Sequence, residues 1–405
     1  MREELGVRAL LTNQNIGQNR PPLQRVREKL YDYNDGHTYE AHPRRRRGAV
    51  GTCSDNDPTA VEWMGGAARA NAAIAGKPTV CSEWDYSCPA RYRSCAGLLM
   101  GTLMSQQDFS AAWRYGWICS LGNRCDELKD GCVFPARPFS GLTDPVGLAT
   151  DRMAVLLFLR GDAPVMSGPG VCLRLTDSAF VREDCIIPRS DKAFPFGGVW
   201  KCRFVQAIAA PVPSGWREMR FEDGEAAKSS SIPYPLSRDP SAVLNRNPAA
   251  KTLTVSTPRS CGGFAFPSSG TVEVGPLAFR LGRSHATVYA ASVDSGPTTL
   301  SLSNRILVMH LTCLQSEGSE FEDDSFRVWL KNGNVPVVAD GDARISLRLE
   351  RPSEYRVWVL DTTGARKEVV PCVADGSTLS FAAHVRGSDG KARLYYEVTR
   401  VEGEL

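Results

Sequence analysis

The sequence has no hydrophobic run long enough to cross a membrane. Its best apolar stretch, Met153 to Leu159, is short and is flanked by Arg152 and Arg160, whereas a spanning helix needs about 20 apolar residues. The chain opens with Met-Arg-Glu-Glu-Leu-Gly, which is not the pattern of a secretory signal peptide. We therefore expect no membrane partner, and the cellular location stays open.

The sequence also lacks an excess of charge of either sign. It has 48 Lys and Arg against 45 Asp and Glu, for a formal net charge of +3, and its pI is near 8.2. The densest basic run, Arg44 to Arg47, follows His42-Pro43 without interleaved aromatic residues, which indicates a solvated loop. The charge balance gives no argument for a nucleic-acid partner, and we expect none.

No Cys-x-x-Cys pair occurs among the 13 cysteines. An odd number of scattered cysteines is neither a disulfide framework nor a zinc ribbon, so we interpret most of them as small buried hydrophobic residues. One alternative is a Cys/His hydrolase with Cys81 or Cys88 as nucleophile and His37 as base, which needs a thiol of low pKa. Another is zinc bound by those three residues and His42, whose spacing fits no zinc motif. We predict no metal and no cofactor.

The stretch from Lys77 to Pro89 is a short apolar strand that ends in acidic and aromatic residues. Pro78 precedes the apolar run Thr79 to Cys81, and the character changes abruptly at Glu83 and Trp84. A carboxylate that leaves an apolar strand beside an indole is a place where its position and its pKa can both be set. The alternative is a strand-end acid that only faces water.

Strand and helix patterns alternate over residues 1–162. The first predicted strand, Val7 to Leu11, ends in polar residues that include Asn13 and Asn15, and the second ends near His37 and Tyr39. An extended segment from Phe109 to Cys119 carries Trp113 and Trp117, and a helix should begin at Asp144-Pro145. Further helices are expected over Pro21 to Leu30, Ala60 to Ala75 and Tyr92 to Gln106. Four strand-helix repeats predict a parallel sheet whose strands open on one common face.

The rest of the chain is β-rich. Residues 163–320 contain short alternating runs, with a linker or long surface loop at about residues 222–250. Residues 321–405 alternate cleanly between turns such as Asn332-Gly333 and Asp340-Gly341, which predicts an immunoglobulin-like β-sandwich. The predicted organisation therefore has three parts, with boundaries after residues 162 and 320.

The order of motifs in the first part resembles that of a known family. His37-x-Tyr39, Glu83 and the pair Trp113 and Trp117 match, in type and order, the C-terminal half of a clan A glycoside hydrolase barrel, and the stretches around them look like cellulase-like, family 5-type proteins of environmental and gut bacteria. In that superfamily His-x-Tyr ends strand six, the nucleophilic glutamate ends strand seven, and a sugar-stacking tryptophan comes from strand eight. The resemblance implies an α/β plus all-β fold, namely strands five to eight of a (β/α)8 barrel followed by antiparallel β-sandwich regions.

The resemblance also implies roles for individual residues. Glu83 would be the nucleophile of a retaining glycosidase acting on a β-linked oligo- or polysaccharide, Tyr39 would hydrogen bond to it, and His37 would orient sugar hydroxyls or the second acid. The implied substrate-binding residues are Trp84, Trp113, Trp117, Asn13 and Asn15.

One part of the family pattern is missing. The family's general acid lies in an Asn-Glu pair that ends strand four, and the resemblance places Met1 just after that strand. Glu3, Glu4 and Glu28 belong to helices or helix ends and are poor substitutes. We therefore expect a fragment that lacks its general acid and is nearly inactive alone, with an N-terminal half or a second chain as its partner.

A non-catalytic carbohydrate-binding or scaffold protein is the alternative from another class. Its function would lie in the β-rich part, and it needs an exposed aromatic row, for which Trp329, Tyr355 and Trp358 are the candidates. These residues alternate within strands, which favours core packing over exposure.

Overall fold

The structure is a computed structural model, and it describes residues 2–12, 21–44, 46–61, 73–117, 136–176, 199–221 and 238–401. Asn13 and Asn15 lie outside the described residues, as does most of the helix expected over residues 60–75. None of the helices in these ranges has the length and apolar character that crossing a membrane requires.

The described α-helices are short. They are α1 (Arg2–Leu5), α2 (Pro21–Leu30), α4 (Ala96–Gln106) and α5 (Pro145–Ala154). A 3-10 turn, Arg91–Cys95, leads into α4, and a π-helical turn, Val155–Leu159, continues α5. The carboxylate of Asp144 accepts a hydrogen bond of 2.8 Å from the Gly147 N–H, so the helix start predicted at Asp144-Pro145 is confirmed.

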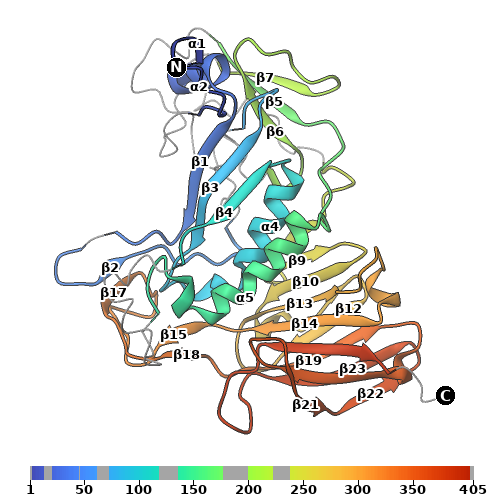
Figure 1. Cartoon of the computed structure of the whole chain (residues 1–405). Coiled ribbons are helices and arrows are strands. Elements are labelled where there is room, and N and C mark those ends of the chain that lie inside the picture. Colours follow the sequence, from blue (N-terminus) through green and yellow to red (C-terminus); the bar gives the residue numbers. More distant parts are fainter. Residues whose placement is uncertain are drawn as a thin grey trace.

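Three parallel strands carry the predicted site. They are β1 (Asn34–Glu40), β3 (Thr79–Tyr86) and β4 (Ala111–Arg114), in the order β1-β3-β4. In Figure 1, α4 and α5 lie between this sheet and the large sheets of the C-terminal part. Every residue of α4 is buried, because its Leu- and Met-rich sequence packs against α5 and belongs to the core that includes residues of β3 and of the sandwich.

A second small parallel sheet lies beside α2. It has the order β6-β5-β7, with β5 at Val171–Leu175, β6 at Phe204–Ala207 and β7 at Arg217–Phe221. The carboxylate of Glu28 on α2 accepts hydrogen bonds from the N–H groups of Ile208, Ala209 and Ala210 at 2.6 to 2.8 Å. Glu28 therefore has a structural partner, and it fixes α2 to the end of β6.

Most strands between residues 244 and 400 form two antiparallel sheets that face each other. The larger, with the order β21-β20-β24-β14-β13-β10-β9-β8, has eight strands, and the smaller, with the order β11-β12-β19-β23-β22, has five. The larger consists of β8 (Leu244–Asn247), β9 (Thr252–Ser256), β10 (Ser260–Ala265), β13 (Ala286–Ser292), β14 (Arg305–Leu311), β20 (Tyr355–Leu360), β21 (Arg366–Val370) and β24 (Tyr395–Arg400). The smaller consists of β11 (Thr271–Val274), β12 (Leu277–Leu281), β19 (Asp342–Arg348), β22 (Cys372–Asp375) and β23 (Thr378–His384).

The larger sheet is covered on both faces. Alternate residues such as Ile306 and Val308 pack against the smaller sheet, whereas Met309 and Leu311 of the same strand belong to the core that α4 and α5 share. This alternation follows from the two-residue period of a strand. The sandwich and the three-stranded sheet are therefore joined by one continuous hydrophobic core.

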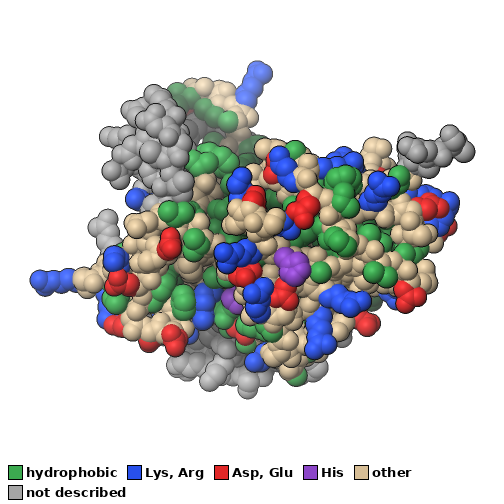
Figure 2. All heavy atoms as spheres, turned by 90° about the horizontal axis from the view of Figure 1, so that it is seen from below, with side chains coloured by type: hydrophobic (Ala, Val, Ile, Leu, Met, Phe, Trp, Pro, Cys, Tyr) green, Lys and Arg blue, Asp and Glu red, His purple; other side chains and the backbone are tan. Residues whose placement is uncertain are grey.

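A segment between β14 and β19 returns to the N-terminal part of the chain. It contains β15 (Leu314–Ser316), β16 (Glu320–Phe321), β17 (Val328–Lys331) and β18 (Pro336–Val338). β17 pairs with β2 (Gly51–Thr52), the short strand that follows β1. On the face seen in Figure 2, Lys and Arg side chains are interspersed with Asp and Glu, as the balanced composition requires.

The predicted half (β/α)8 barrel is wrong. The described residues are mainly strands rather than alternating strands and helices, and the described sheets contain no closed barrel. The strand expected at Val7 to Leu11 does not form, and Leu10 is 69% exposed. A barrel strand needs a paired neighbour on each side, whereas β1 and β4 are the edges of a three-stranded sheet. The fold is mainly β, and not the α/β plus all-β class that the resemblance implied.

Candidate active site

The pairing of β1 with β3 brings the predicted catalytic residues together. His37 lies opposite Glu83 in the register, and a bulge precedes this pair, because Asp35 lies opposite Val80. β3 thus has one residue more than β1 over this interval, and a bulge of this kind re-aims the side chains that follow it. His37 and Tyr39 are two residues apart and so project from the same face of β1.

Both side chains contact the same oxygen of Glu83. The Tyr39 hydroxyl donates a short hydrogen bond to Oε2 of Glu83, and Nδ1 of His37 lies 3.0 Å from the same atom. The other carboxylate oxygen, Oε1, makes no hydrogen bond within the described part of the chain. The Glu83 side chain is 28% exposed and that of His37 is 13% exposed, so the carboxylate is held on one side and reaches solvent.

A third residue, Ser82, fixes the orientation of the His37 ring. Nε2 of His37 lies 3.2 Å from the Ser82 hydroxyl, and the backbone N–H of Ser82 donates to the buried carboxylate of Asp35 at 3.1 Å. When Nδ1 carries the ring proton and donates to Glu83, Nε2 is free to accept from Ser82. Nδ1 of His37 therefore faces Glu83, and Nε2 faces Ser82.

Tyr39 is the centre of an aromatic cluster around the carboxylate. Its ring centroid lies 5.2 Å from that of His42, 5.3 Å from Phe139 and 6.4 Å from Tyr115. Burial, followed by the hydrogen bond to Glu83, raises the pKa of the Tyr39 phenol well above its ordinary value of 10.0. The phenol is therefore a permanent hydrogen-bond donor to Glu83 near neutral pH.

The three tryptophans expected to bind substrate differ in exposure. Trp113 on β4 is 56% exposed and Trp117 just beyond it is 60% exposed, so both indoles offer area to a ligand. Trp84 is only 4% exposed, and the guanidinium of Arg114 lies 5.6 Å from the centre of its ring. Trp84 belongs to the core beneath the site.

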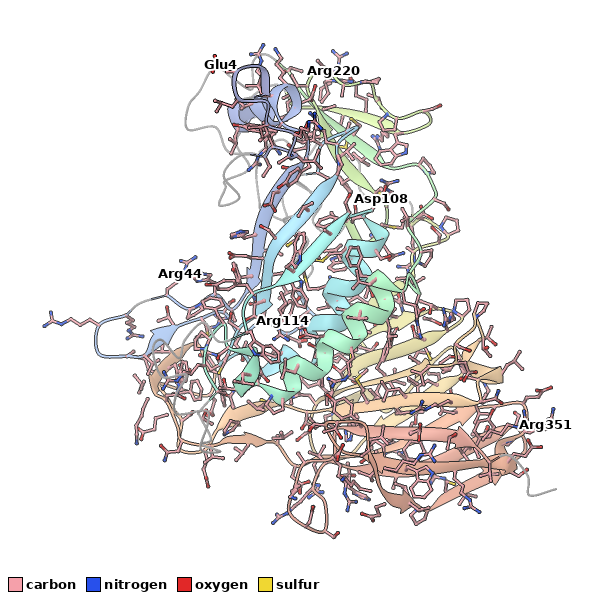
Figure 3. All side chains as sticks on the ribbon, viewed as in Figure 1. Glu4, Arg44, Asp108, Arg114, Arg220 and Arg351 are labelled. Carbon is pink, nitrogen blue, oxygen red and sulfur yellow. The ribbon has the colours of Figure 1, made fainter. Side chains whose placement is uncertain are left out.

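A buried ion-pair network lies beneath the carboxylate. Arg114, labelled in Figure 3 near the end of β4, donates to Asp85 at 2.9 Å and to Asp151 of α5 at 2.8 Å. It also donates to the Gly147 carbonyl at 2.6 Å. Asp85 follows Glu83 by two residues, so Arg114 ties the end of β3 to α5.

The two cysteines considered as nucleophiles do not suit that role. Cys81 and Cys88 are both buried, and burial raises the pKa of the Cys88 thiol to about 12, where it is not a thiolate at neutral pH. The described residues contain no group of three or more His, Cys, Asp or Glu side chains arranged to bind a metal ion.

The aromatic row proposed for the β-rich part is buried. Trp329 is 2% exposed and Tyr355 is 6% exposed, and the Tyr355 hydroxyl donates to the Ser303 carbonyl at 2.9 Å. Trp358 is partly buried, with the Arg366 guanidinium 5.4 Å from its ring centre. The interpretation of Trp329 and Tyr355 as core residues is confirmed.

The sequence analysis did not identify Ser82 and Phe139 as residues of the site. Ser82 is a small polar residue in a strand, and nothing in its spacing marks a contact to His37. Phe139 reaches the cluster from a loop, with a positive φ of 55°. A positive φ in a bulky residue is rare and marks a constrained position, but no sequence pattern predicts this conformation for Phe139.

No family model, curated protein or solved structure matches this chain.

Proposed function

We propose that this protein hydrolyses a β-linked carbohydrate by a retaining mechanism in which Glu83 is the nucleophile. The observation that supports this role best is the pair of contacts at Oε2 of Glu83, from the Tyr39 hydroxyl and from His37. Two donors on one oxygen orient a carboxylate and leave its other oxygen to attack. The exposed indoles of Trp113 and Trp117 suit stacking on pyranose faces.

The reaction has two displacements. Oε1 of Glu83 attacks the anomeric carbon, the bond from that carbon to the leaving oxygen breaks, and a glycosyl ester of Glu83 forms. Water then attacks the same carbon, the bond from that carbon to Oε1 breaks, and the proton that the water loses passes to the second carboxylate or, where that group is absent, to solvent. Tyr39 and His37 keep their hydrogen bonds to Oε2 in the free carboxylate, and they hold the ester carbonyl in the intermediate.

The leaving oxygen normally takes a proton from a second carboxyl group about 5 Å from the nucleophile. A 2,4-dinitrophenolate leaves without that proton. If the general acid lies outside this chain, dinitrophenyl β-glycosides will be hydrolysed, whereas substrates with poor leaving groups will not. This comparison separates the role of Glu83 from the supply of the acid.

The test is the rate of hydrolysis of dinitrophenyl β-glycosides of glucose, galactose, mannose and xylose by the full chain. We expect Glu83→Gln to abolish hydrolysis of the best substrate. The matched control is Glu273→Gln, since Glu273 is an exposed glutamate on β11 of the sandwich. Equal hydrolysis by wild type and Glu83→Gln would contradict the assignment of the nucleophile.

A further inference from the structure

Ser82, His37 and Glu83 form a triad in which one imidazole ring contacts both of the other side chains. The Ser82 hydroxyl lies 3.2 Å from Nε2 of His37, and Nδ1 of the same ring lies 3.0 Å from Oε2 of Glu83. A hydroxyl at one ring nitrogen and a carboxylate at the other is the arrangement of nucleophile, base and orienting acid in serine hydrolases. The triad therefore has the geometry for a reaction other than glycoside hydrolysis.

The irregular part of β3 lets two successive residues reach the same ring. In a regular strand, Ser82 and Glu83 would point to opposite faces of the sheet. Between Val80 and Glu83, however, β3 has one residue more than β1, and between Cys81 and Trp84 it has one residue more than β4. Both register shifts include Ser82. Bulges of this kind are common next to active sites, where they change the direction of a side chain.

A buried carboxylate holds the backbone of the triad's serine. Asp35 is 5% exposed, and its Oδ1 accepts hydrogen bonds from the Ser82 N–H at 3.1 Å and from the Gly36 N–H at 2.6 Å. Ser82 itself is partly exposed, as are the side chains of His37 and Glu83. The Ser82 backbone is therefore fixed while the triad stays within reach of a molecule from solvent.

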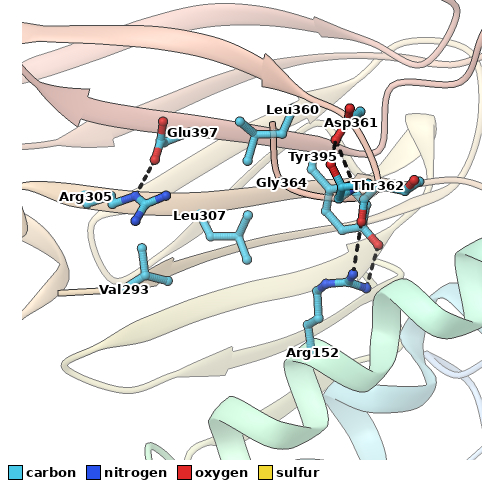
Figure 4. A pocket seen from close by; sticks show the side chains of 11 residues that line it. Arg152, Val293, Arg305, Leu307, Leu360, Asp361, Thr362, Gly364, Tyr395 and Glu397 are labelled. Carbon is cyan, nitrogen blue, oxygen red and sulfur yellow. Dashed lines mark hydrogen bonds and ion pairs between the residues drawn. The ribbon is translucent and has the colours of Figure 1, made fainter. Parts of the chain in front are cut away.

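The cavity shown in Figure 4 is separate from the triad. It has a volume of about 250 Å³ and lies between α5 and the larger sheet, with Arg152, Arg305 and Glu397 among its lining residues. Its lining contains two arginines and two carboxylates, so the charges balance, and none of its lining residues belongs to β1 or β3. A reagent bound in this cavity would not contact Ser82.

We propose that the triad is an esterase site, with Ser82 as nucleophile, His37 as general base and Glu83 as the residue that positions the base. Its substrate class is a carboxylic ester with a small apolar acyl group, which suits the Tyr39 ring whose centroid lies 6.4 Å from that of His37. The proposal requires the His37 tautomer that carries its proton on Nδ1, because Nε2 must accept the serine proton. It does not rest on glycoside hydrolysis, since Glu83 forms no bond with the ester.

The ester reaction has two steps. Oγ of Ser82 attacks the carbonyl carbon and gives its proton to Nε2 of His37; the bond from that carbon to the alcohol oxygen breaks, and the alcohol leaves with the proton from Nε2. Water then attacks the acyl carbon and gives a proton to Nε2, the bond to Oγ breaks, Oγ takes the proton back, and the carboxylic acid leaves. Glu83 keeps its contact with Nδ1 and stabilises the ring while the ring is positively charged.

The test is the reaction of the full chain with diisopropyl fluorophosphate, followed by mass spectrometry of its peptides. We expect one diisopropylphosphoryl group on Ser82, with release of fluoride, because a serine hydroxyl is a weak nucleophile unless a base activates it. This measurement on the wild-type chain does not depend on the folding of any variant. Ser346 is the internal control, since it is a partly exposed serine of β19 whose hydroxyl lies 2.8 Å from that of Ser380; it should stay unmodified.

Variants of the triad distinguish an activated serine from one that only forms a hydrogen bond. Ser82→Ala and His37→Gln should each lower the hydrolysis of p-nitrophenyl acetate roughly 100-fold or more, and His37→Gln should also prevent labelling of Ser82. Glu83→Gln should lower kcat with little change in KM, because Glu83 positions the base and does not touch the ester. The matched control is His384→Gln, which replaces an exposed histidine of β23 and should leave labelling and hydrolysis unchanged.

Three results would overturn the esterase assignment: no phosphoryl group on Ser82, labelling of Ser82 that persists in His37→Gln, or hydrolysis of p-nitrophenyl acetate that is unaffected by Ser82→Ala. The role of Glu83 as a glycosidase nucleophile is tested separately by the dinitrophenyl glycosides, which contain no carboxylic ester. Failure of one proposal is therefore distinguishable from failure of the other.

Discussion

At the scale of single residues, the Tyr39 hydroxyl is the group that most directly orients the Glu83 carboxylate. The hydroxyl donates to Oε2 of Glu83, and burial keeps it protonated. A hydrogen bond to a charged group is worth about 1.5–3 kcal/mol. We therefore expect Tyr39→Phe to lower kcat/KM for a dinitrophenyl glycoside by roughly 10- to 100-fold, with little change in the melting temperature.

The matched control for Tyr39 is Tyr115→Phe. The Tyr115 ring lies in the same aromatic cluster, 6.4 Å from that of Tyr39, but among the described residues the groups that contact the Glu83 carboxylate are Tyr39 and His37 alone. If both variants lost activity equally, the effect would come from ring packing and not from the hydrogen bond to Glu83.

His310 provides a second test at this scale, on stability. The residue is fully buried, neither ring nitrogen has a hydrogen-bond partner among the described residues, and burial lowers its pKa from 6.5 to about 4. Asp342 acts in the opposite direction, and His384 acts in the same direction as burial. Between pH 6.5 and pH 4 the unfolded chain binds a proton that the folded chain does not, so stability falls as the pH falls through this window.

We expect His310 to lower the free energy of unfolding by about 2 kcal/mol as the pH falls from 7 to 5. Urea unfolding at the two pH values measures the loss, and His310→Leu should reduce it by that amount. A variant with the same pH dependence as wild type would show that another group titrates.

The residues that meet at the candidate site were predictable because their types and order carry information. Glu83 follows an apolar strand, and His37 and Tyr39 are spaced to share a face, so the sequence predicted which residues to bring together. The bulge between the two strands and the contact from Ser82 depend on register. Register is set by pairing across about 45 residues, and no local pattern encodes it.

At the scale of elements, Arg114 determines how β3, β4 and α5 fit together. Its side chain is 14% exposed, and its partner Asp85 is 5% exposed. Removal of one member of a buried pair leaves an uncompensated charge and typically costs 3–5 kcal/mol. We expect Arg114→Met to destabilise the protein by about this amount and to lower kcat through the displaced end of β3.

The matched control for Arg114 is Lys331→Gln, which removes an exposed ion pair with Glu320 and should change stability by about 1 kcal/mol or less. Adding Asp85→Asn to Arg114→Met should restore part of the loss, because the buried charge is then gone. Equal effects of Arg114→Met and Lys331→Gln on the urea midpoint would refute this account of the network.

Local signals predicted elements better than architecture. The helix start at Asp144 and the strand that carries Glu83 were predicted and are present. The strand at Val7 to Leu11 was wrong, because an apolar run forms a strand only where a neighbour pairs with it. The partner was assumed because four strand-helix repeats predicted a parallel sheet.

At the scale of the whole molecule, one core connects the candidate active site to the sandwich. Leu98 of α4, Trp84 of β3 and Met309 of β14 belong to the same buried cluster. β24 pairs with both β14 and β20. The last strand of the chain therefore lies inside a sheet whose first strand, β8, comes more than 100 residues earlier. Such distant pairings were not predictable from alternation alone.

The shared core predicts a single unfolding transition. Cys95 lies next to α4 and Cys261 lies in β10, and both are fully buried. We expect the two thiols to become reactive toward a maleimide over the same range of urea concentration, as measured by mass spectrometry of the labelled peptides. If Cys95 became reactive at clearly lower urea, the N-terminal part would unfold separately.

The most direct test of the central claim is trapping of the glycosyl ester on Glu83. A 2-deoxy-2-fluoro β-glycoside with a dinitrophenolate leaving group forms the ester but hydrolyses it slowly, and it needs no general acid in the first step. With the sugar that the hydrolysis panel selects, we predict an intact-mass increase of one fluoroglycosyl unit, located by peptide mass spectrometry on Glu83 and absent from Glu83→Gln. Modification of a different residue, or no adduct on a chain that hydrolyses the parent glycoside, would contradict the assignment of Glu83 as nucleophile.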